Sequence, residues 1–185
     1  MAASASLLDD VHADRVREVW GSLQRDHGLS GVSVSPFPHL SYQCARDFDI
    51  ALLNEIVEKV AAKARPLKVR TAGLGIFPGP SPVIYIPVVR SPELTRLQLA
   101  LWSAGAMACE EPLAEYHPAA WIPHITIAQG DVTQENLGSV IHTLNGVDLM
   151  WEFEVDNLAI VRGRGDKPQE VVGRHPFTGG SARNF

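Results

Sequence analysis

Residues 37–42 read FPHLSY, and residues 122–127 repeat the pattern as IPHITI. The two hexapeptides agree at every position: an apolar residue, proline, histidine, a branched aliphatic residue, a hydroxyl residue and another apolar residue. A single His-x-Ser is common by chance, whereas two copies that share the proline and both flanking aliphatic positions are much less so. The repeat therefore predicts a fold with two similar halves.

Each hexapeptide is expected on a strand. Side chains at i and i+2 point to one face of a strand, so His39 should project together with Ser41, and His124 together with Thr126. The apolar residues of the motifs then face the core; they are Leu40, Tyr42, Ile125 and Ile127. If a pseudo-twofold axis relates the halves, two imidazoles and two hydroxyls converge on one cleft.

Two imidazoles and two hydroxyls in one cleft could together bind and cleave a phosphodiester. Hydroxyls can bind the non-bridging oxygens, one neutral imidazole can deprotonate an attacking water, and one imidazolium can protonate the leaving oxygen. Histidine, with an unperturbed pKa of about 6.5, can fill either role at neutral pH. No Asp/Glu cluster accompanies the histidines, so we expect no metal and no cofactor. Two alternatives remain: histidines that are only structural, and a nucleotide-binding module without turnover.

Length and composition fit one soluble domain over residues 1–185, with 45% apolar and 20% charged residues. The formal net charge of −5 argues against non-specific binding of long nucleic acid but not against a small phosphorylated substrate. Cys44 and Cys109 form neither a disulfide framework nor a zinc pattern. The sequence has no secretory signal and no apolar run long enough to span a membrane. We therefore expect a cytoplasmic monomer.

Hydrophobic periodicity predicts an α+β order of elements rather than a strict βαβ succession. Helices are expected at 8–27, 48–64, 91–109 and 133–145, and extended segments at 31–35, 39–45, 66–77, 82–90, 121–129 and 151–162. A polar turn at 163–170 should precede a short closing strand, and the end at 179–185 should fray. The Arg-Gly-Asp triplet at 164–166 is interpreted as incidental.

With these motifs the chain resembles the 2H phosphoesterase superfamily, which contains 2′-5′ RNA ligases and 2′,3′-cyclic phosphodiesterases and is named for two His-Φ-Ser/Thr-Φ motifs. The motifs here are HLSY at 39–42 and HITI at 124–127. The approach to the second one, YHPAAWIPH at 116–124, and the segment 75–89 are also similar to the family. The similarity extends over about residues 31–162.

The resemblance implies a bilobal fold: two pseudo-symmetric lobes of antiparallel sheet, with outer helices, around a central groove. It implies hydrolysis of a 2′,3′-cyclic phosphate or a 2′,5′ linkage in a nucleotide or short RNA, generally leaving a 2′-phosphate in the cyclic case. His39 and His124 would then be the proton-transfer pair, and Ser41 and Thr126 the phosphate-binding residues. The same site run in reverse would ligate RNA ends.

The chain departs from the family at two points. Serine replaces the commoner threonine in the first motif, and the helix at 8–27 is an extra one that could cover one end of the groove. Further candidates for stacking on a base or contacting phosphate are Phe77, Tyr85, Tyr116, Trp121 and Arg162. The histidines outside the repeat are expected to be surface or structural residues; they are His12, His27, His117, His142 and His175.

Overall fold

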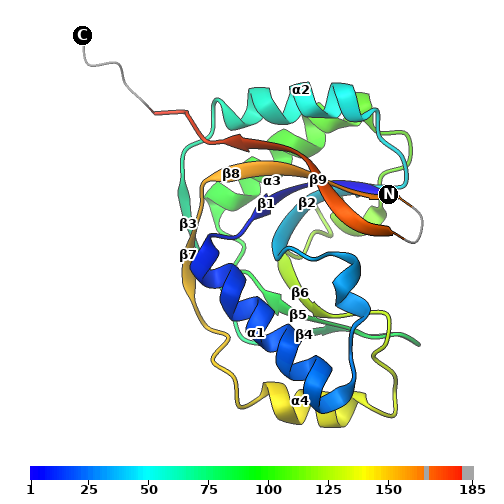
Figure 1. Cartoon of the computed structure of the whole chain (residues 1–185). Coiled ribbons are helices and arrows are strands. Elements are labelled where there is room, and N and C mark those ends of the chain that lie inside the picture. The colour runs from blue at the N-terminus through cyan, green and yellow to red at the C-terminus, as the bar shows by residue number, and fades with distance from the viewer. Residues whose placement is uncertain (165–166, 181–185) are drawn as a thin grey trace.

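The computed structural model describes residues 1–164 and 167–180 (Figure 1). Most of the Arg-Gly-Asp triplet and residues 181–185 of the predicted frayed end lie outside the described residues. The helices are α1 (Asp10–His27), α2 (Ile50–Ala61), α3 (Pro92–Gly105) and α4 (Leu137–Leu144), with 3-10 turns η1 (Gly31–Val34), η2 (Ala106–Ala108) and η3 (Ala114–Tyr116). Within the described residues, none of the helices has the length and apolar character that a bilayer-spanning segment requires.

The strands form two antiparallel lobes, as the resemblance implies. The first lobe has the strand order β2-β1-β8-β9, with β1 (Ala2–Leu7), β2 (His39–Ala45), β8 (Asn157–Arg164) and β9 (Lys167–Pro176). The second lobe contains the sheet β4-β5-β6 and the pair β3-β7, with β3 (Leu67–Arg70), β4 (Gly75–Phe77), β5 (Val83–Pro87), β6 (His124–Ala128) and β7 (Glu152–Val155). A single bridge between Thr71 and Val88 joins these two groups of strands.

The motif strands β2 and β6 occupy equivalent edge positions and lie next to each other between the lobes. In the first lobe, His39 pairs with Leu7 of β1; in the second, His124 pairs with Pro87 of β5. The internal repeat of the sequence thus corresponds to a repeat in strand pairing.

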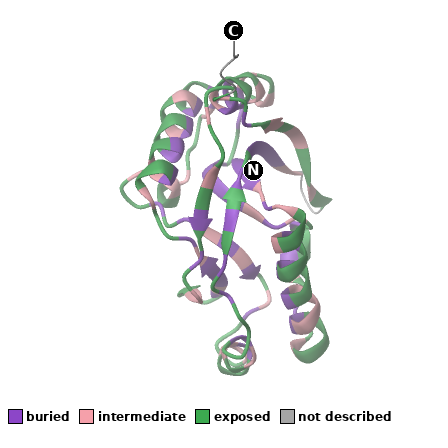
Figure 2. Cartoon of the chain, turned by 90° about the vertical axis from the view of Figure 1, so that its left-hand side faces the viewer, coloured by how far each residue is buried: buried purple, intermediate pink, exposed green. Residues whose placement is uncertain are grey.

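The helices cross between the lobes. Helix α1 connects β1 to β2 of the first lobe but packs on β6 of the second, whereas α3 connects β5 to β6 and packs on β2. Figure 2 shows the buried residues running through the centre of both lobes. One hydrophobic cluster includes Leu40 of β2, Ile125 of β6, Leu23 of α1 and Leu101 of α3. Each lobe is therefore packed against a helix that connects two strands of the other lobe.

Three of the predicted helices begin where the sequence places a capping residue. The side chains of Asp9, Asp49 and Ser91 accept backbone N–H groups at the starts of α1, α2 and α3, which satisfies donors that a helix start otherwise leaves unpaired. Pro92 occupies the first turn of α3, where it lacks only an N–H that would be unpaired. Gly28 ends α1 in the left-handed conformation, with φ of 69°.

Four expectations about strands were wrong. No element was predicted at 2–7, yet β1 is an inner strand of the first sheet; its residues are mostly alanine and serine rather than the β-branched and aromatic residues that mark a strand. The single strand expected at 66–77 is two strands, β3 and β4, separated at Gly73 with φ of 79°. The strand expected at 151–162 is also two strands, because the chain passes from β7 in the second lobe to β8 in the first at Asp156. The closing strand β9 is long and begins at Lys167, inside the predicted turn.

The segment expected to be extended at 31–35 is the 3-10 turn η1 instead. One carboxylate oxygen of Asp131 accepts the backbone N–H groups of Ser30 and Gly31, both at 2.6 Å. This partner lies about a hundred residues further along the chain, so local sequence cannot reveal the turn.

Candidate active site

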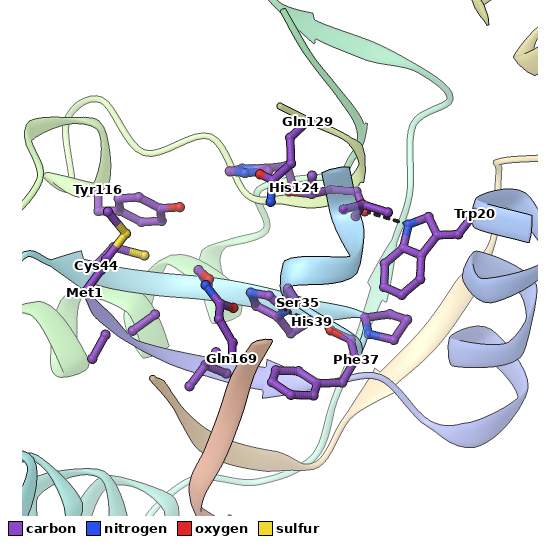
Figure 3. Close-up of a pocket in the computed structure, with 17 residues that line it drawn as sticks. Met1, Trp20, Ser35, Phe37, His39, Cys44, Tyr116, His124, Gln129 and Gln169 are labelled. Atoms are coloured by element: carbon purple, nitrogen blue, oxygen red, sulfur yellow. Dashed lines mark hydrogen bonds between the residues drawn. The ribbon is translucent and has the colours of Figure 1, made fainter. Parts of the chain in front are cut away.

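The two motifs line one cavity of about 150 Å³ between β2 and β6 (Figure 3). His39 and Ser41 enter it from the first lobe, and His124 and Thr126 from the second. Leu40, Ile125 and Ile127 have no exposed surface, and neither has Tyr42, as the alternation predicts. The convergence expected from the sequence is therefore present.

Both imidazoles are oriented by the same contact. Nδ1 of His39 lies 3.0 Å from the carbonyl oxygen of Phe37, and Nδ1 of His124 lies 2.7 Å from that of Ile122. A carbonyl oxygen only accepts, so Nδ1 carries the proton in both rings and Nε2 of the neutral ring keeps its lone pair. The proline between the two residues restricts the preceding backbone. This accounts for the apolar-Pro-His pattern in both hexapeptides.

Burial lowers the pKa of both imidazoles. For His39, burial is the largest cause; the Phe37 carbonyl opposes it, and the charge of His124 lowers the pKa further. For His124, burial again dominates and the Ile122 carbonyl opposes it. Both rings are consequently mainly neutral at neutral pH when the cavity is empty.

A bulge at the last residue of each motif, Tyr42 in β2 and Ile127 in β6, reverses the alternation of side chains beyond it. The pairing shifts between Ser4 and Ala5 opposite β2, and between Ile84 and Tyr85 opposite β6. As a result the residue five positions after each histidine faces the cavity, Cys44 in the first lobe and Gln129 in the second. Strict alternation along the two strands would have turned Cys44 and Gln129 away from the cavity.

Tyr116 is the one further candidate that lines the cavity. Its phenol and the Cys44 thiol are near enough to affect each other's pKa, and the Ser41 hydroxyl lowers the pKa of both. Burial raises the pKa of Tyr116 well above its ordinary value and that of Cys44 to about 11. Both groups are therefore protonated at neutral pH and available as hydrogen-bond donors.

The remaining candidates lie elsewhere. Phe77 and Tyr85 stack on each other with ring centroids 4.1 Å apart and pack against His124 without lining the cavity. Trp121 is 2% exposed, so its ring face is not open to a base. Arg162 is paired with Glu170 at 2.7 Å and is not part of the cavity wall. None of these four residues lines the cavity, and their contact with a base or a phosphate stays a prediction.

Several lining residues were not identified from the sequence. Trp20 of α1 forms one wall and donates its indole N–H to the Thr126 carbonyl at 3.3 Å; helix α1 thus covers part of the groove. Ser35 precedes the first hexapeptide, Phe37 is its first residue, and Gln169 comes from β9. The position of Phe37 next to the motif is the only local signal among them. Gln169 lies on a strand whose extent was underestimated.

The other histidines have structural contacts or are exposed. His12 is 2.7 Å from Asp9 and packs between Trp151 and Phe153, and His27 is 2.8 Å from the Thr143 hydroxyl. None of the five lines the cavity. Among the residues that the structure describes, no group of three or more His, Cys, Asp or Glu side chains is arranged to hold a metal ion.

Comparison with known proteins agrees with this geometry. A family model described as the 2′-5′ RNA ligase superfamily matches residues 8–167, a range that includes α1. A Bacillus anthracis protein (strain CDC 684 / NRRL 3495) named "Putative phosphoesterase" is 30% identical over 127 residues, which cover 67% of this chain and 69% of that one. A Bacillus thuringiensis protein (strain Al Hakam) of the same name is 29% identical over the same length, with the same coverage.

Two solved structures share the fold. The TT0787 protein of Thermus thermophilus has a TM-score of 0.66 at 16% identity, with 97% of this chain and 98% of that chain covered. LigT of E. coli complexed with 3′-AMP has a TM-score of 0.54 at 15% identity, with 96% and 97% covered. At these identities the likeness concerns the fold alone.

Proposed function

Because the chain belongs to the 2′-5′ RNA ligase superfamily, a group of 2H phosphoesterases, we propose that it is a metal-independent phosphodiesterase. Its substrates are nucleotides or short oligonucleotides with a 2′,3′-cyclic phosphate or a 2′,5′ linkage. One observation carries the proposal: His39 and His124 share one cavity, and the carbonyl contact at Nδ1 leaves Nε2 of each ring free for proton transfer. Binding alone would not require two such imidazoles.

In the proposed reaction a water attacks phosphorus while one Nε2 accepts its proton and the other Nε2 donates a proton to the leaving oxygen. The base is ready at neutral pH because burial keeps the rings neutral. The acid is supplied on binding, because the negative charge of the phosphate raises the pKa of a nearby imidazole. In the alternative, ligation, the 5′-hydroxyl of a second RNA end takes the place of water: its oxygen bonds to phosphorus as the bond from phosphorus to O3′ breaks, and the same two imidazoles transfer the protons.

The hydroxyls of Ser41 and Thr126 are proposed to bind the non-bridging phosphate oxygens, with the Tyr116 phenol as a third donor beside Ser41. Donors fixed in a partly enclosed cavity stabilise the charge that develops in the transition state. The small volume of the cavity and the net charge of −5 favour a small substrate over long RNA. The structure of LigT was determined with 3′-AMP, a ligand of that size. A cytoplasmic monomer remains our expectation.

The test is hydrolysis of a nucleoside 2′,3′-cyclic phosphate in the presence of EDTA, with the product identified as the 2′- or 3′-phosphate. We expect activity that survives EDTA and is lost in His39→Ala and in His124→Ala. His142→Ala serves as the matched control, because His142 is exposed on α4 away from the cavity. Turnover that requires a metal, or full activity in either motif variant, would contradict the proposal.

A further inference from the structure

One wall of the cavity is formed by the first sheet and has no part in the proposed reaction. Ala3 of β1 pairs with Cys44 of β2 on one side and with Val161 of β8 on the other. Residues that pair directly across strands point to the same face of a sheet, and all three line the cavity. These three side chains, which we name the sheet row, are small or aliphatic and uncharged at neutral pH.

Gln169 extends the sheet row onto β9. Val161 pairs with Val171, and Gln169 lies two residues before Val171 on the same strand, so it faces the same side of the sheet. Gln169 also lines the cavity, and Figure 3 shows its side chain pointing into it. The wall of small and aliphatic side chains therefore ends in an amide.

The carbonyl oxygen of this amide lacks a partner. Oε1 of Gln169 is buried, and no residue that the structure describes hydrogen-bonds to it. Among the described residues that line the cavity, no other side-chain oxygen or nitrogen is in this state. A buried polar atom left unpaired costs about 1–3 kcal/mol. In the wall of a binding cavity, such an atom indicates that a ligand supplies the missing hydrogen bond.

The partner of Oε1 has to carry a proton. A carbonyl oxygen only accepts hydrogen bonds, and the oxygens of an ionised phosphodiester have no proton to donate. In a nucleoside 2′,3′-cyclic phosphate, O2′ and O3′ are both bonded to phosphorus, so neither of them can donate. The donors that remain are the N–H groups of the base and, where it is free, the 5′-hydroxyl.

The sheet row favours the base over the hydroxyl. Proteins that enclose a nucleobase contact its faces with apolar or aromatic side chains and its edge with hydrogen-bonding groups. Ala3 and Val161 offer an apolar surface, and the small side chain of Ala3 leaves the space above the sheet unfilled. Gln169 offers an acceptor and a donor side by side, which is how glutamine amides bind the edge of a base.

We infer that the sheet row and Gln169 bind the nucleobase of the substrate, with the Gln169 amide hydrogen-bonded to the edge of the base. The inference rests on the proposed function and identifies what holds the part of the substrate beside the phosphate. Oε1 accepts an N–H of the base, and Nε2 donates to the neighbouring ring nitrogen or carbonyl oxygen. Gln169 takes no part in proton transfer, so its contribution belongs to binding and specificity rather than to the chemical step.

Gln169→Leu tests these hydrogen bonds. The substitution keeps the approximate size of the side chain but removes its donor and acceptor. The KM for cytidine 2′,3′-cyclic phosphate should therefore rise about 10-fold, while kcat stays within about twofold. Hydrolysis of methyl riboside 2′,3′-cyclic phosphate, which has no base, should be unchanged. The matched control is Gln24→Leu, at an exposed glutamine of α1 outside the cavity. Equal losses on the two substrates, or no loss on either, would overturn the inference.

Gln169→Glu tests whether the amide contacts the edge of the base. At pH 8 the carboxylate accepts a hydrogen bond from the exocyclic amine of cytosine but repels the carbonyl oxygen that uracil has at the same position. The ratio of kcat/KM for the cytidine and uridine cyclic phosphates should therefore rise about 10-fold above that of the unsubstituted protein. A ratio that does not change would refute the contact to the base edge.

Calorimetry separates this inference from the proposed function, because it needs no turnover. Cytidine 2′-phosphate should bind the Gln169→Leu protein about 10-fold more weakly than the Gln24→Leu protein. If this difference is found but the unsubstituted protein hydrolyses no cyclic phosphate, the proposed function is wrong and the base contact stands. If the unsubstituted protein hydrolyses the cyclic phosphate and the two variants bind cytidine 2′-phosphate equally, the base contact is wrong and the proposed function stands.

Discussion

The indole N–H of Trp121 donates to the main-chain carbonyl of Ser41 at 3.0 Å. Trp20 donates in the same way to the carbonyl of Thr126. Because β2 and β6 are edge strands, some of their carbonyls lack a strand partner, and an unpaired buried carbonyl is costly. Trp121, just before the second motif, is therefore bonded to β2, and Trp20 of α1 is bonded to β6. Together the two bonds hold Ser41 and Thr126 at a fixed separation.

Trp121→Phe should destabilise the fold. The substitution keeps an aromatic ring but leaves the Ser41 carbonyl without its donor, at a cost of about 1–3 kcal/mol. Urea denaturation measures the loss. Trp102→Phe is the control, since Trp102 is only half-buried and its ring contacts the exposed His117. Equal effects of the two substitutions would show that the indole–carbonyl bond contributes nothing.

Removing either cavity hydroxyl should slow the reaction. Hydrogen bonds to charged groups contribute about 1.5–3 kcal/mol, so Ser41→Ala and Thr126→Val should each lower kcat/KM roughly 10- to 100-fold. Ser41→Thr and Thr126→Ser keep the hydroxyl and should retain most activity. Steady-state kinetics on the cyclic phosphate decide the point; a Thr126→Val enzyme as active as Thr126→Ser would exclude a phosphate contact.

Stability should fall on mild acidification because of the buried imidazoles. Burial lowers the pKa of His39 and His124, so below about pH 6.5 the unfolded chain binds protons that the native protein does not. The contribution of the two imidazoles to the free energy of unfolding is complete above about pH 6.5. It is lost progressively as the pH falls from about 6.5 to the pKa values of the two rings in the native protein. His39→Gln should therefore reduce the drop in unfolding free energy between about pH 7.5 and pH 5. Urea denaturation at the two pH values measures the drop, and a drop of the same size in His39→Gln and in the unmodified protein would contradict the prediction.

Cys44 should react only slowly with alkylating reagents at neutral pH. Burial raises the pKa of its thiol to about 11, so only about a thousandth of the thiol is ionised near pH 8. Iodoacetamide followed by mass spectrometry should modify Cys109, which is more exposed, before Cys44. A 2′-nucleotide should protect Cys44 and not Cys109. Protection of both, or of neither, would place the ligand elsewhere.

The pairing of His39 with Ser41, and of His124 with Thr126, on one face of a strand could be predicted because that information is local, whereas their convergence was predicted from the internal repeat and the pseudo-twofold axis that it suggests. Each motif carries its own strand alternation, and the proline explains the orientation of the histidine. The helix starts at Asp9, Asp49 and Ser91 are likewise encoded by a residue and its next turn. These are the features that short-range patterns determine.

What could not be predicted depends on distant partners. The 3-10 turn after Ser30 requires Asp131, and strand β1 is recognisable only once β2 and β8 flank it. The bulges that bring Cys44 and Gln129 into the cavity leave no trace in the hydrophobic pattern. Phe77 and Tyr85 stack on each other beside His124, and this arrangement depends on the space that Gly75 leaves for the Tyr85 ring; their stacking on a base stays a prediction.

Gly75→Ala provides the sharpest test of that space. Gly75 does not have a positive φ, so an alanine adds no backbone strain, and its whole effect comes from the Cβ that meets the Tyr85 ring. Overpacking of this kind costs about 1–3 kcal/mol, and urea denaturation measures the loss. Gly138→Ala is the control: in α4 nothing lies within 4 Å of the added Cβ, and helical alanine should stabilise by roughly 0.5–1 kcal/mol. A Gly75→Ala protein with unaltered stability would contradict the overlap between the added Cβ and the Tyr85 ring.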